Sequence, residues 1–226
     1  MNLKKIIATK SGCYAANRTI APKGIMVHST GANNPNLWRY VAPDDGTIGV
    51  NKYNNSFNTP DGGGRNVCPH AVIGKLKDGS VATVQILPWN RRGWHAGGKA
   101  NDTHISFEIA EDSLTDRVYF DKIYQEAVEL CAMLCKEYNI NPLINVIDHA
   151  EGYKLGIASA HADVGHWFGR FGKTMTMFRT AVKAEMGKRA EPKKLYRVQV
   201  GAFSSKTNAE NFLKEIKSKG LEGFIV

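Results

Sequence analysis

The spacing of apolar and polar residues predicts several β-strands in the first 150 positions. Residues 104–112 (HISFEIAED) alternate cleanly, which places the apolar side chains on one face of a strand and Glu108 on the other. Residues 24–30 (GIMVHST) and 141–149 (NPLINVIDH) read as two short buried strands that each lead into a histidine. Two apolar runs within residues 70–87 flank KDG, and Asp-Gly between such runs signals a hairpin.

Apolar residues at helical spacing predict two α-helices. The first covers about residues 116–138 and is followed by Pro142, and its apolar stripe consists of Ile123, Ala127, Leu130, Cys131, Leu134 and Tyr138. The second runs from about residue 173 to residue 186. Because strands and helices mix along the chain, we expect residues 1–185 to form one α/β domain.

A change of composition marks the end of this domain. Residues 186–194 are charged and contain a proline, which is typical of a linker. Residues 195–226 then predict a strand, a helix that Thr207 and Glu210 would open with a capping box, and a second strand. A unit of this size is too small to bury a proper core, so we expect it to be part of a larger α+β domain.

Composition and charge narrow the classes of function. The chain has 226 residues and a net charge of +9, and residues 186–226 alone hold nine Lys or Arg against four Asp or Glu. A basic protein can meet nucleic acid, an anionic membrane or an anionic cell wall. The basic residues form no stripe with aromatic residues between them, which disfavours nucleic acid. No apolar run approaches the roughly 20 residues of a membrane span, and the run near the N-terminus is too short for a signal peptide.

The four cysteines suggest neither a disulfide framework nor a metal site. They are Cys13, Cys68, Cys131 and Cys135, and no two of them form a CxxC pair. The last two lie on the apolar stripe of the predicted helix. We therefore expect Cys131 and Cys135 to be buried thiols.

Three segments each offer a metal ligand at or just after the end of a predicted strand. These ligands are His28, His149 and the pair His161 and Asp163, and residues two apart in an extended segment point the same way. Two histidines and one carboxylate suit a catalytic zinc, which keeps its fourth position for water. Glu108, on the polar face of its strand, is the candidate to take the proton of that water.

His161 is the candidate to stabilise an oxyanion or to protonate a leaving amine. The other histidines are expected to be structural, since an isolated histidine is more often a hydrogen-bonding residue than a ligand. His166, followed by two aromatic residues, is expected to pack, and His70 and His104 are expected to be structural or peripheral. The HxD pattern of His161 and Asp163 also occurs in non-haem iron oxygenases, but no second histidine lies well downstream of it.

Five strings occur in an order that resembles one enzyme family. They are HST, PHAVIG with DGSV, GWHAGG, ISFEIAED and DHAEGYKLGIASAHADVGHWF, and they run through most of residues 20–180. Together they resemble the zinc-dependent N-acetylmuramoyl-L-alanine amidases of type 2, which are related to peptidoglycan recognition proteins and include many phage endolysins. The resemblance implies a mixed central β-sheet flanked by helices, with Zn²⁺ in a groove. It also implies hydrolysis of the amide between the lactyl group of N-acetylmuramic acid and L-alanine.

Position by position, the resemblance assigns roles to individual residues. His28, His149 and Asp163 match the zinc ligands, and Glu108 matches the catalytic acid. His161 stands where many members have lysine, so oxyanion stabilisation there would depend on pH near the ordinary histidine pKa of about 6.5. Trp94 and His95 match a segment beside the cleft and are expected to contact substrate, with residues 58–64 as a further part of the groove wall.

The tail resembles the first half of a SPOR domain, which binds the glycan strands of peptidoglycan. The expected partner is therefore the bacterial cell wall, with no nucleic acid and no membrane insertion. Such an enzyme would be made in the bacterial cytoplasm without a signal peptide and would act after release by a holin or by lysis, as an endolysin or an autolysin. A zinc peptidase that cuts the stem peptide and a recognition module without catalysis are the alternatives.

Overall fold

The computed structural model describes residues 1–188 and 199–225, and these residues fall into the two units of the chain, Met1–Lys188 and Arg189–Val226. The first unit contains a six-stranded sheet in the order β1-β4-β3-β5-β2-β6. The strands are β1 (Leu3–Lys5), β2 (Gly24–Ser29), β3 (Ala71–Lys75), β4 (Val81–Gln85), β5 (His104–Ile109) and β6 (Val146–Asp148). Only the β3–β4 pair is antiparallel, so the sheet is mixed as the family resemblance implied.

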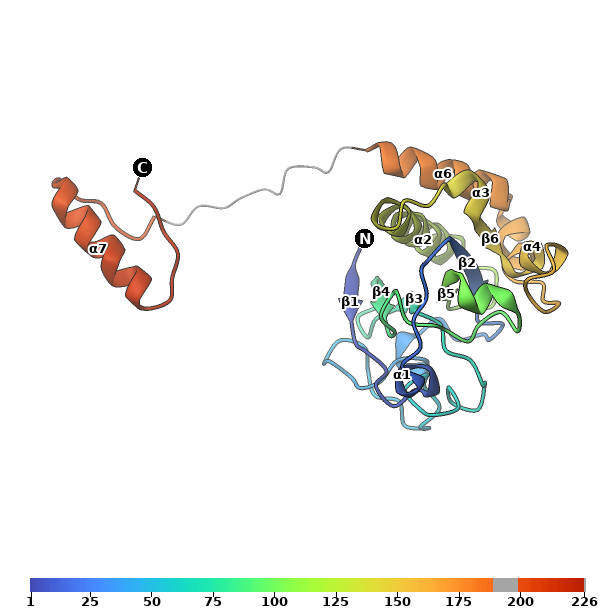
Figure 1. Ribbon diagram of the computed structural model, residues 1–226. Helices are drawn as coiled ribbons and strands as arrows, with labels where there is room; N and C mark the ends of the chain where they lie inside the picture. Colours follow the sequence, from blue (N-terminus) through green and yellow to red (C-terminus); the bar gives the residue numbers. More distant parts are fainter. Residues whose placement is uncertain (189–198, 226) are drawn as a thin grey trace. The chain divides into compact units, whose positions relative to one another are not determined.

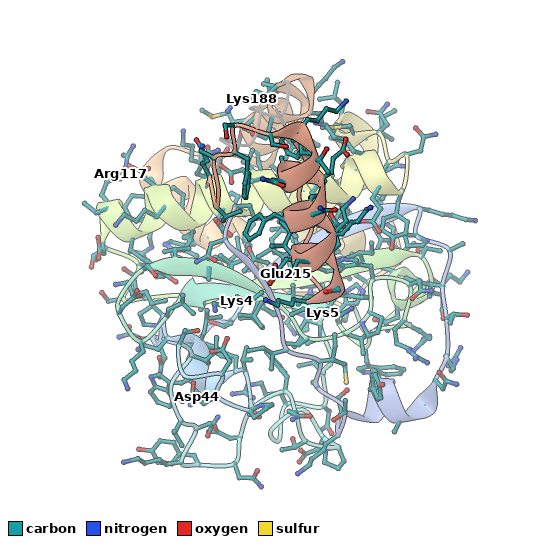
Figure 2. The ribbon with its side chains drawn as sticks, turned by 90° about the vertical axis from the view of Figure 1, so that its left-hand side faces the viewer. Lys4, Lys5, Asp44, Arg117, Lys188 and Glu215 are labelled. Atoms are coloured by element: carbon teal, nitrogen blue, oxygen red, sulfur yellow. The ribbon has the colours of Figure 1, made fainter. Side chains whose placement is uncertain are left out.

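Helices pack around this sheet. They are α1 (Gly12–Ala16), α2 (Arg117–Glu137), α3 (Pro142–Asn145), α4 (His149–Lys154), α5 (Gly165–Phe168) and α6 (Met175–Gly187), with short 3₁₀ turns at Leu37–Arg39, Lys99–Asp102 and Gly169–Phe171. Figure 1 shows α2 on one side of the strands and the long segment between β2 and β3 on the other. In Figure 2, Arg117 marks the beginning of α2 above the sheet, and Asp44 lies in that long segment below it.

The alternation of residues in β5 decides which face meets α2. Ile105, Phe107 and Ile109 are fully buried in one cluster with the apolar stripe of α2. The carboxylate of Asp116 caps α2 by accepting a hydrogen bond from the backbone N–H of Tyr119 at 2.9 Å. The strand and the long helix therefore lie where the sequence pattern predicts them, and the face that carries Glu108 turns away from α2.

The segment leading to His149 differs from its prediction. A single strand was expected over residues 141–149, but the chain first forms α3, and only Val146–Asp148 is a strand. Asn141 caps α3 with its side chain, and Pro142 follows at the first helical position, where its missing N–H costs nothing. His149 then begins α4, because Asp148 and Glu151 form a capping box around it.

The second unit is described through α7 (Lys206–Ser218) and its flanking segments. The predicted linker does not begin at residue 186, because Met186 and Gly187 belong to α6; residues 189–194 of the predicted linker lie outside the described residues. Of the two predicted strands, residues 195–198 and 226 also lie outside, and residues 199–203 and 221–225 form no strand. The predicted capping box is wrong, since α7 begins one residue before Thr207 and its N-cap, Ser205, makes no side-chain hydrogen bond.

No helix among the described residues is both long enough and apolar enough to cross a membrane. All four cysteines are free thiols, and Cys131 and Cys135 are buried, as expected. Three of them are buried, whereas Cys13 is only half-buried.

Candidate functional site

Three side chains from distant parts of the chain meet at one edge of the sheet. His28 lies near the carboxyl end of β2, His149 directly follows the neighbouring strand β6, and Asp163 lies in the segment before α5. Because β2 and β6 are parallel, their carboxyl ends meet at the same edge. One ligand atom from each of the three residues lies within 4.8 Å of the other two.

The two oxygens of Asp163 face different histidines of the cluster, at distances close to those in a tetrahedral metal site. His28 Nδ1 lies 3.1 Å from Asp163 Oδ2 and 3.2 Å from His149 Nδ1, and His149 Nδ1 lies 3.8 Å from Asp163 Oδ1. Ligand atoms bound to zinc at about 2.0–2.1 Å in a tetrahedron lie about 3.3 Å from one another. Two imidazoles and one carboxylate, already this close, could therefore hold Zn²⁺ after small movements.

Hydrogen bonds behind His28 orient its ring. His95 is buried, and its Nε2 donates to the backbone carbonyl of His104 at 3.3 Å. Burial and the neighbouring histidines hold the pKa of His95 well below its ordinary value, so the ring is neutral and its Nδ1 can only accept. His28 Nε2 lies 3.1 Å from that atom and must donate to it. The lone pair of His28 for a metal is thus on Nδ1, which faces Asp163.

The electrostatics of the cluster favour a cation. Burial alone would lower the pKa of His28, but its hydrogen bond with Asp163 and the charge of Glu108 raise it above the ordinary value. Burial alone would raise the pKa of Asp163, but the same hydrogen bond lowers it. A position that attracts a proton in this way also attracts a metal ion, which displaces the proton when it binds.

Glu108 stands beside His28 on the same edge. The two residues are register partners in the parallel pair β5–β2. Burial raises the pKa of Glu108 to about 7, even though the nearby His28 and Arg65 act to lower it. Its Oε2 atom is buried and finds no hydrogen-bond partner among the described residues. A carboxyl group that titrates near neutrality and has a free oxygen can accept and release a proton.

His161 lies against the ring of His149. The residue is exposed, and its ring centroid lies 4.5 Å from that of His149. Its Nδ1 lies 3.2 Å from the hydroxyl of Ser159. The structure therefore brings together all five residues that the sequence analysis assigned to metal binding and catalysis.

Trp94 and His95, the two expected substrate contacts, occupy different environments. Trp94 is 48% exposed, and Arg92 lies over its ring at 5.2 Å. His95 is 6% exposed and lies behind His28. Trp94 thus has a surface for a ligand, whereas the contacts of His95 are those of a residue that positions His28.

The remaining histidines lie outside the metal cluster. His166 pairs with the buried Glu111, Nε2 to Oε1 at 3.0 Å. His70 is fully buried, accepts a hydrogen bond from the backbone N–H of Ser106 on Nδ1 at 3.0 Å and donates from Nε2 to the carbonyl of Arg91 at 2.7 Å. His70 therefore has a structural role, as expected, whereas His166 is exposed and pairs with a carboxylate instead of packing.

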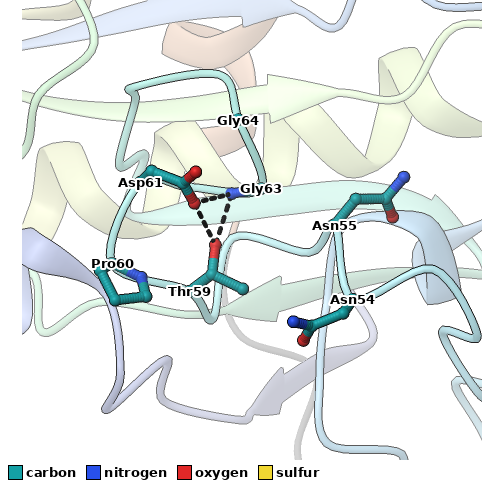
Figure 3. A pocket seen from close by; sticks show the side chains of 7 residues that line it. All are labelled: Asn54, Asn55, Thr59, Pro60, Asp61, Gly63 and Gly64. Atoms are coloured by element: carbon teal, nitrogen blue, oxygen red, sulfur yellow. Dashed lines mark hydrogen bonds between the residues drawn. The ribbon is translucent and has the colours of Figure 1, made fainter.

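A polar pocket lies in the long segment between β2 and β3 (Figure 3). It has a volume of about 480 Å³ and is lined by Asn54, Asn55, Thr59, Pro60, Asp61, Gly63 and Gly64. Arg65 holds this segment together by donating to two backbone carbonyls and stacking on Tyr40 and Phe57. The charge of Arg65 also acts to lower the pKa of Glu108, which places Arg65 near that carboxyl group.

Sequence reasoning missed the residues that support the site. Ser159, Asn101 and Arg65 carry no motif signal of their own, since serine, asparagine and arginine are common in loops. Ser159 is two residues from His161, but only the fold shows that its hydroxyl contacts the rings of His149 and His161.

Comparison with known proteins gives two matches to family models. The family described as N-acetylmuramoyl-L-alanine amidase matches residues 17–166, and the SPOR domain matches residues 181–226. No curated protein matches the chain. Among solved structures, the hydrolase AmiA of Staphylococcus aureus in complex with its ligand is similar at a TM-score of 0.58 and 14% identity, over 82% of this chain and 83% of that one.

Two further structures show the same fold. The PlyG catalytic domain has a TM-score of 0.56 and 25% identity, over 85% of this chain and 99% of that one. The catalytic domain of XlyA has a TM-score of 0.54 and 24% identity, over 80% of this chain and 99% of that one. The amidase model covers well over half of the sequence, and the chain therefore belongs to the N-acetylmuramoyl-L-alanine amidase family, with a C-terminal region that matches the SPOR domain.

Proposed function

We propose that the chain hydrolyses the amide between the lactyl group of N-acetylmuramic acid and L-alanine, with Zn²⁺ held by His28, His149 and Asp163. The observation that carries the proposal is the convergence of these three ligand atoms beside the unpartnered carboxyl oxygen of Glu108. Family membership supports the choice of bond, because the matching family is one of N-acetylmuramoyl-L-alanine amidases.

The protein's own residues divide the chemistry among them. Zinc, when bound, lowers the pKa of a water molecule and polarises the carbonyl of the substrate. Glu108 takes the proton of the water that attacks the carbonyl carbon. His161 hydrogen-bonds the carbonyl oxygen as its negative charge develops, or gives a proton to the amine of L-alanine as the C–N bond breaks. A pKa of about 7 suits Glu108 to this task near neutral pH.

The two units of the chain take different parts in this function. Residues 1–185 are the catalytic domain in our proposal, and residues 195–226 bind the cell wall. The SPOR match and the excess of basic residues after position 186 support the second assignment. We infer that the enzyme acts on the wall after its release from the cell that makes it.

Product analysis tests the proposal directly. Purified Gram-positive peptidoglycan is digested with the full chain, with and without a chelator, and the new amino termini are identified. We expect free L-alanine amino termini that appear only when metal is present. New termini from other stem residues would show a peptidase, and bound zinc without any product would show a recognition module.

A further inference from the structure

One hydroxyl group connects two histidines of the proposed site to the backbone. Ser159 lies between α4 and α5, and its Oγ is 3.2 Å from the carbonyl oxygen of Ala96, 3.3 Å from His149 Nε2 and 3.2 Å from His161 Nδ1. Neither the family match nor the sequence motifs assign a role to this residue.

The number of protons decides the direction of each hydrogen bond. A serine hydroxyl has one proton to donate and two lone pairs to accept with. The carbonyl of Ala96 can only accept, so the proton of Ser159 goes there. Both lone pairs then face imidazole nitrogens, and each of these nitrogens must carry a proton.

The backbone around Ala96 holds this arrangement in place. The side chain of Asn101 accepts hydrogen bonds from the backbone N–H groups of His95 and Ala96 at 2.8 and 2.9 Å. The backbone N–H of Ser159 donates to the same carbonyl of Ala96 at 2.8 Å. At Gly97 the backbone has φ +63°, and a Cβ atom there would lie 2.7 Å from Ser159 Oγ, so glycine permits the close approach.

We propose that Ser159 is a positioning residue that sets the tautomers of both His149 and His161. His149 is protonated on Nε2, which leaves the lone pair of Nδ1 pointing at His28 and Asp163. His161 donates from Nδ1 to Ser159, which leaves Nε2 as the nitrogen that can carry the proton donated to the substrate in the proposed reaction, and within residues 1–188 and 199–225 no side chain bonds that atom. The benefit to metal binding and catalysis rests on the proposed function, whereas the tautomers do not.

The loop that carries His95 and Ala96 thereby supports both metal-binding histidines. The side chain of His95 fixes the ring of His28, and the carbonyl of Ala96 fixes the ring of His149 through Ser159. Removing a group that holds a metal ligand in this way typically lowers metal affinity by about 10- to 100-fold.

The first test measures tautomers in the metal-free full chain. Nitrogen-15 NMR of the imidazole rings, assigned with His149→Asn and His161→Asn, should show a protonated Nε2 in His149 and a protonated Nδ1 in His161. The opposite tautomer in either ring would overturn the proposal. This measurement needs no Ser159 variant and no activity.

The second test measures zinc affinity by competition with a coloured chelator. Ser159→Ala should weaken zinc binding by about 10- to 100-fold and lose the fixed tautomers. Ser159→Thr keeps the hydroxyl and should stay close to wild type, as should Ser80→Ala, which removes an exposed hydroxyl from the β3–β4 turn. Unchanged zinc affinity and unchanged tautomers in Ser159→Ala would refute the proposal, whereas failure of the wild type to bind zinc would instead contradict the proposed function.

Discussion

At the scale of single residues, His28 and His166 show how burial and neighbours separate a ligand from a structural histidine. His28 is 2% exposed and its Nδ1 faces Asp163 and His149, whereas His166 faces Glu111. His28→Ala should lose bound zinc, because the two remaining ligands cannot hold it well. Elemental analysis of the dialysed protein measures this loss.

His166→Ala is the matched control for that experiment. It removes a histidine three positions after Asp163 but none of the metal cluster, so zinc occupancy should stay at the wild-type level. Full zinc occupancy in His28→Ala would rule out the ligand assignment.

Glu108 is expected to move a proton without holding the metal. Glu108→Gln keeps the shape of the side chain but removes its ability to accept a proton. The variant should retain zinc and lose turnover by about 100-fold or more. Glu137→Gln, an exposed change at the end of α2, serves as the control. An active Glu108→Gln enzyme with normal zinc content would assign the proton transfer to another group.

His70 makes the stability of the fold depend on pH. Burial lowers its pKa to about 4, and its Nδ1 already accepts the N–H of Ser106, so a second proton would break that bond. The ordinary value is 6.5, so the unfolded chain takes up the proton first as the pH falls. The contribution of His70 is therefore complete above pH 6.5 and is lost between pH 6.5 and 4, by at most about 3 kcal/mol.

Urea unfolding at several pH values measures this effect. The midpoint for the wild type should fall as the pH drops through that window, and it should fall less steeply in His70→Gln. His104, whose pKa burial also lowers to about 4, adds to the slope in both proteins. Equal slopes would show that His70 binds its proton equally well in the folded and the unfolded chain.

At the scale of elements, α5 anchors the segment that carries Asp163. Trp167 and Phe168 are fully buried in the cluster beneath α2, with Trp167 against Tyr119 and Phe120. Val164, next to Asp163, is buried in the same cluster. The position of the carboxylate ligand thus depends on aromatic packing on the other side of its own segment.

Because of this dependence, removing the side chain of Trp167 should lower both the stability of the fold and its affinity for zinc. Trp167→Ala leaves a large cavity and should lower the free energy of unfolding by about 3–5 kcal/mol. It should also weaken zinc binding, since Asp163 loses its support. Trp94→Ala removes a half-exposed tryptophan and should change stability by no more than about 0.5 kcal/mol. Chemical unfolding monitored by circular dichroism compares the two, and equal stability losses would contradict the argument.

At the scale of the whole molecule, the metal cluster is built entirely from the first unit. His28, His149 and Asp163 all lie within Met1–Lys188, while the SPOR match extends over residues 181–226. The SPOR match begins within α6, and residues 181–187 form the end of that helix in the first unit. We therefore expect catalysis to depend on the first unit and attachment to the cell wall to depend on the second.

A fragment of residues 1–188 tests this separation. It should bind zinc and cleave a soluble muramoyl-peptide at a rate close to that of the full chain. It should sediment less with insoluble peptidoglycan, and raised salt should reduce the difference, because basic residues contribute to the attachment. Equal sedimentation of fragment and full chain would remove the wall-binding role from the tail.

Several helices and strands of the first unit could be predicted from local patterns in the sequence. The alternation in residues 104–112 and the helical stripe in residues 116–138 depend on the period of the backbone, so β5 and α2 could be predicted from the sequence. The identities of the five site residues came from motif order and from their places at the ends of strands. The short α3 was not predicted, because it has only four residues. Its start depends on the cap that Asn141 and Pro142 provide at the beginning of an apolar run.

The amino-acid sequence by itself determined the mixture of strands and helices and the candidate ligands, since periodicity and residue type are local properties of the chain, and the order of its motifs indicated the family and its fold through a resemblance. Tertiary structure alone decided which ring nitrogens face the metal position, that His95 lies behind His28, and that Ser159 joins His149 to His161. It also raised the pKa of Glu108 to about 7 by burial. These properties depend on distances between atoms that are far apart in sequence, and a hydrogen bond or a desolvated carboxyl exists only once the fold has brought such atoms together.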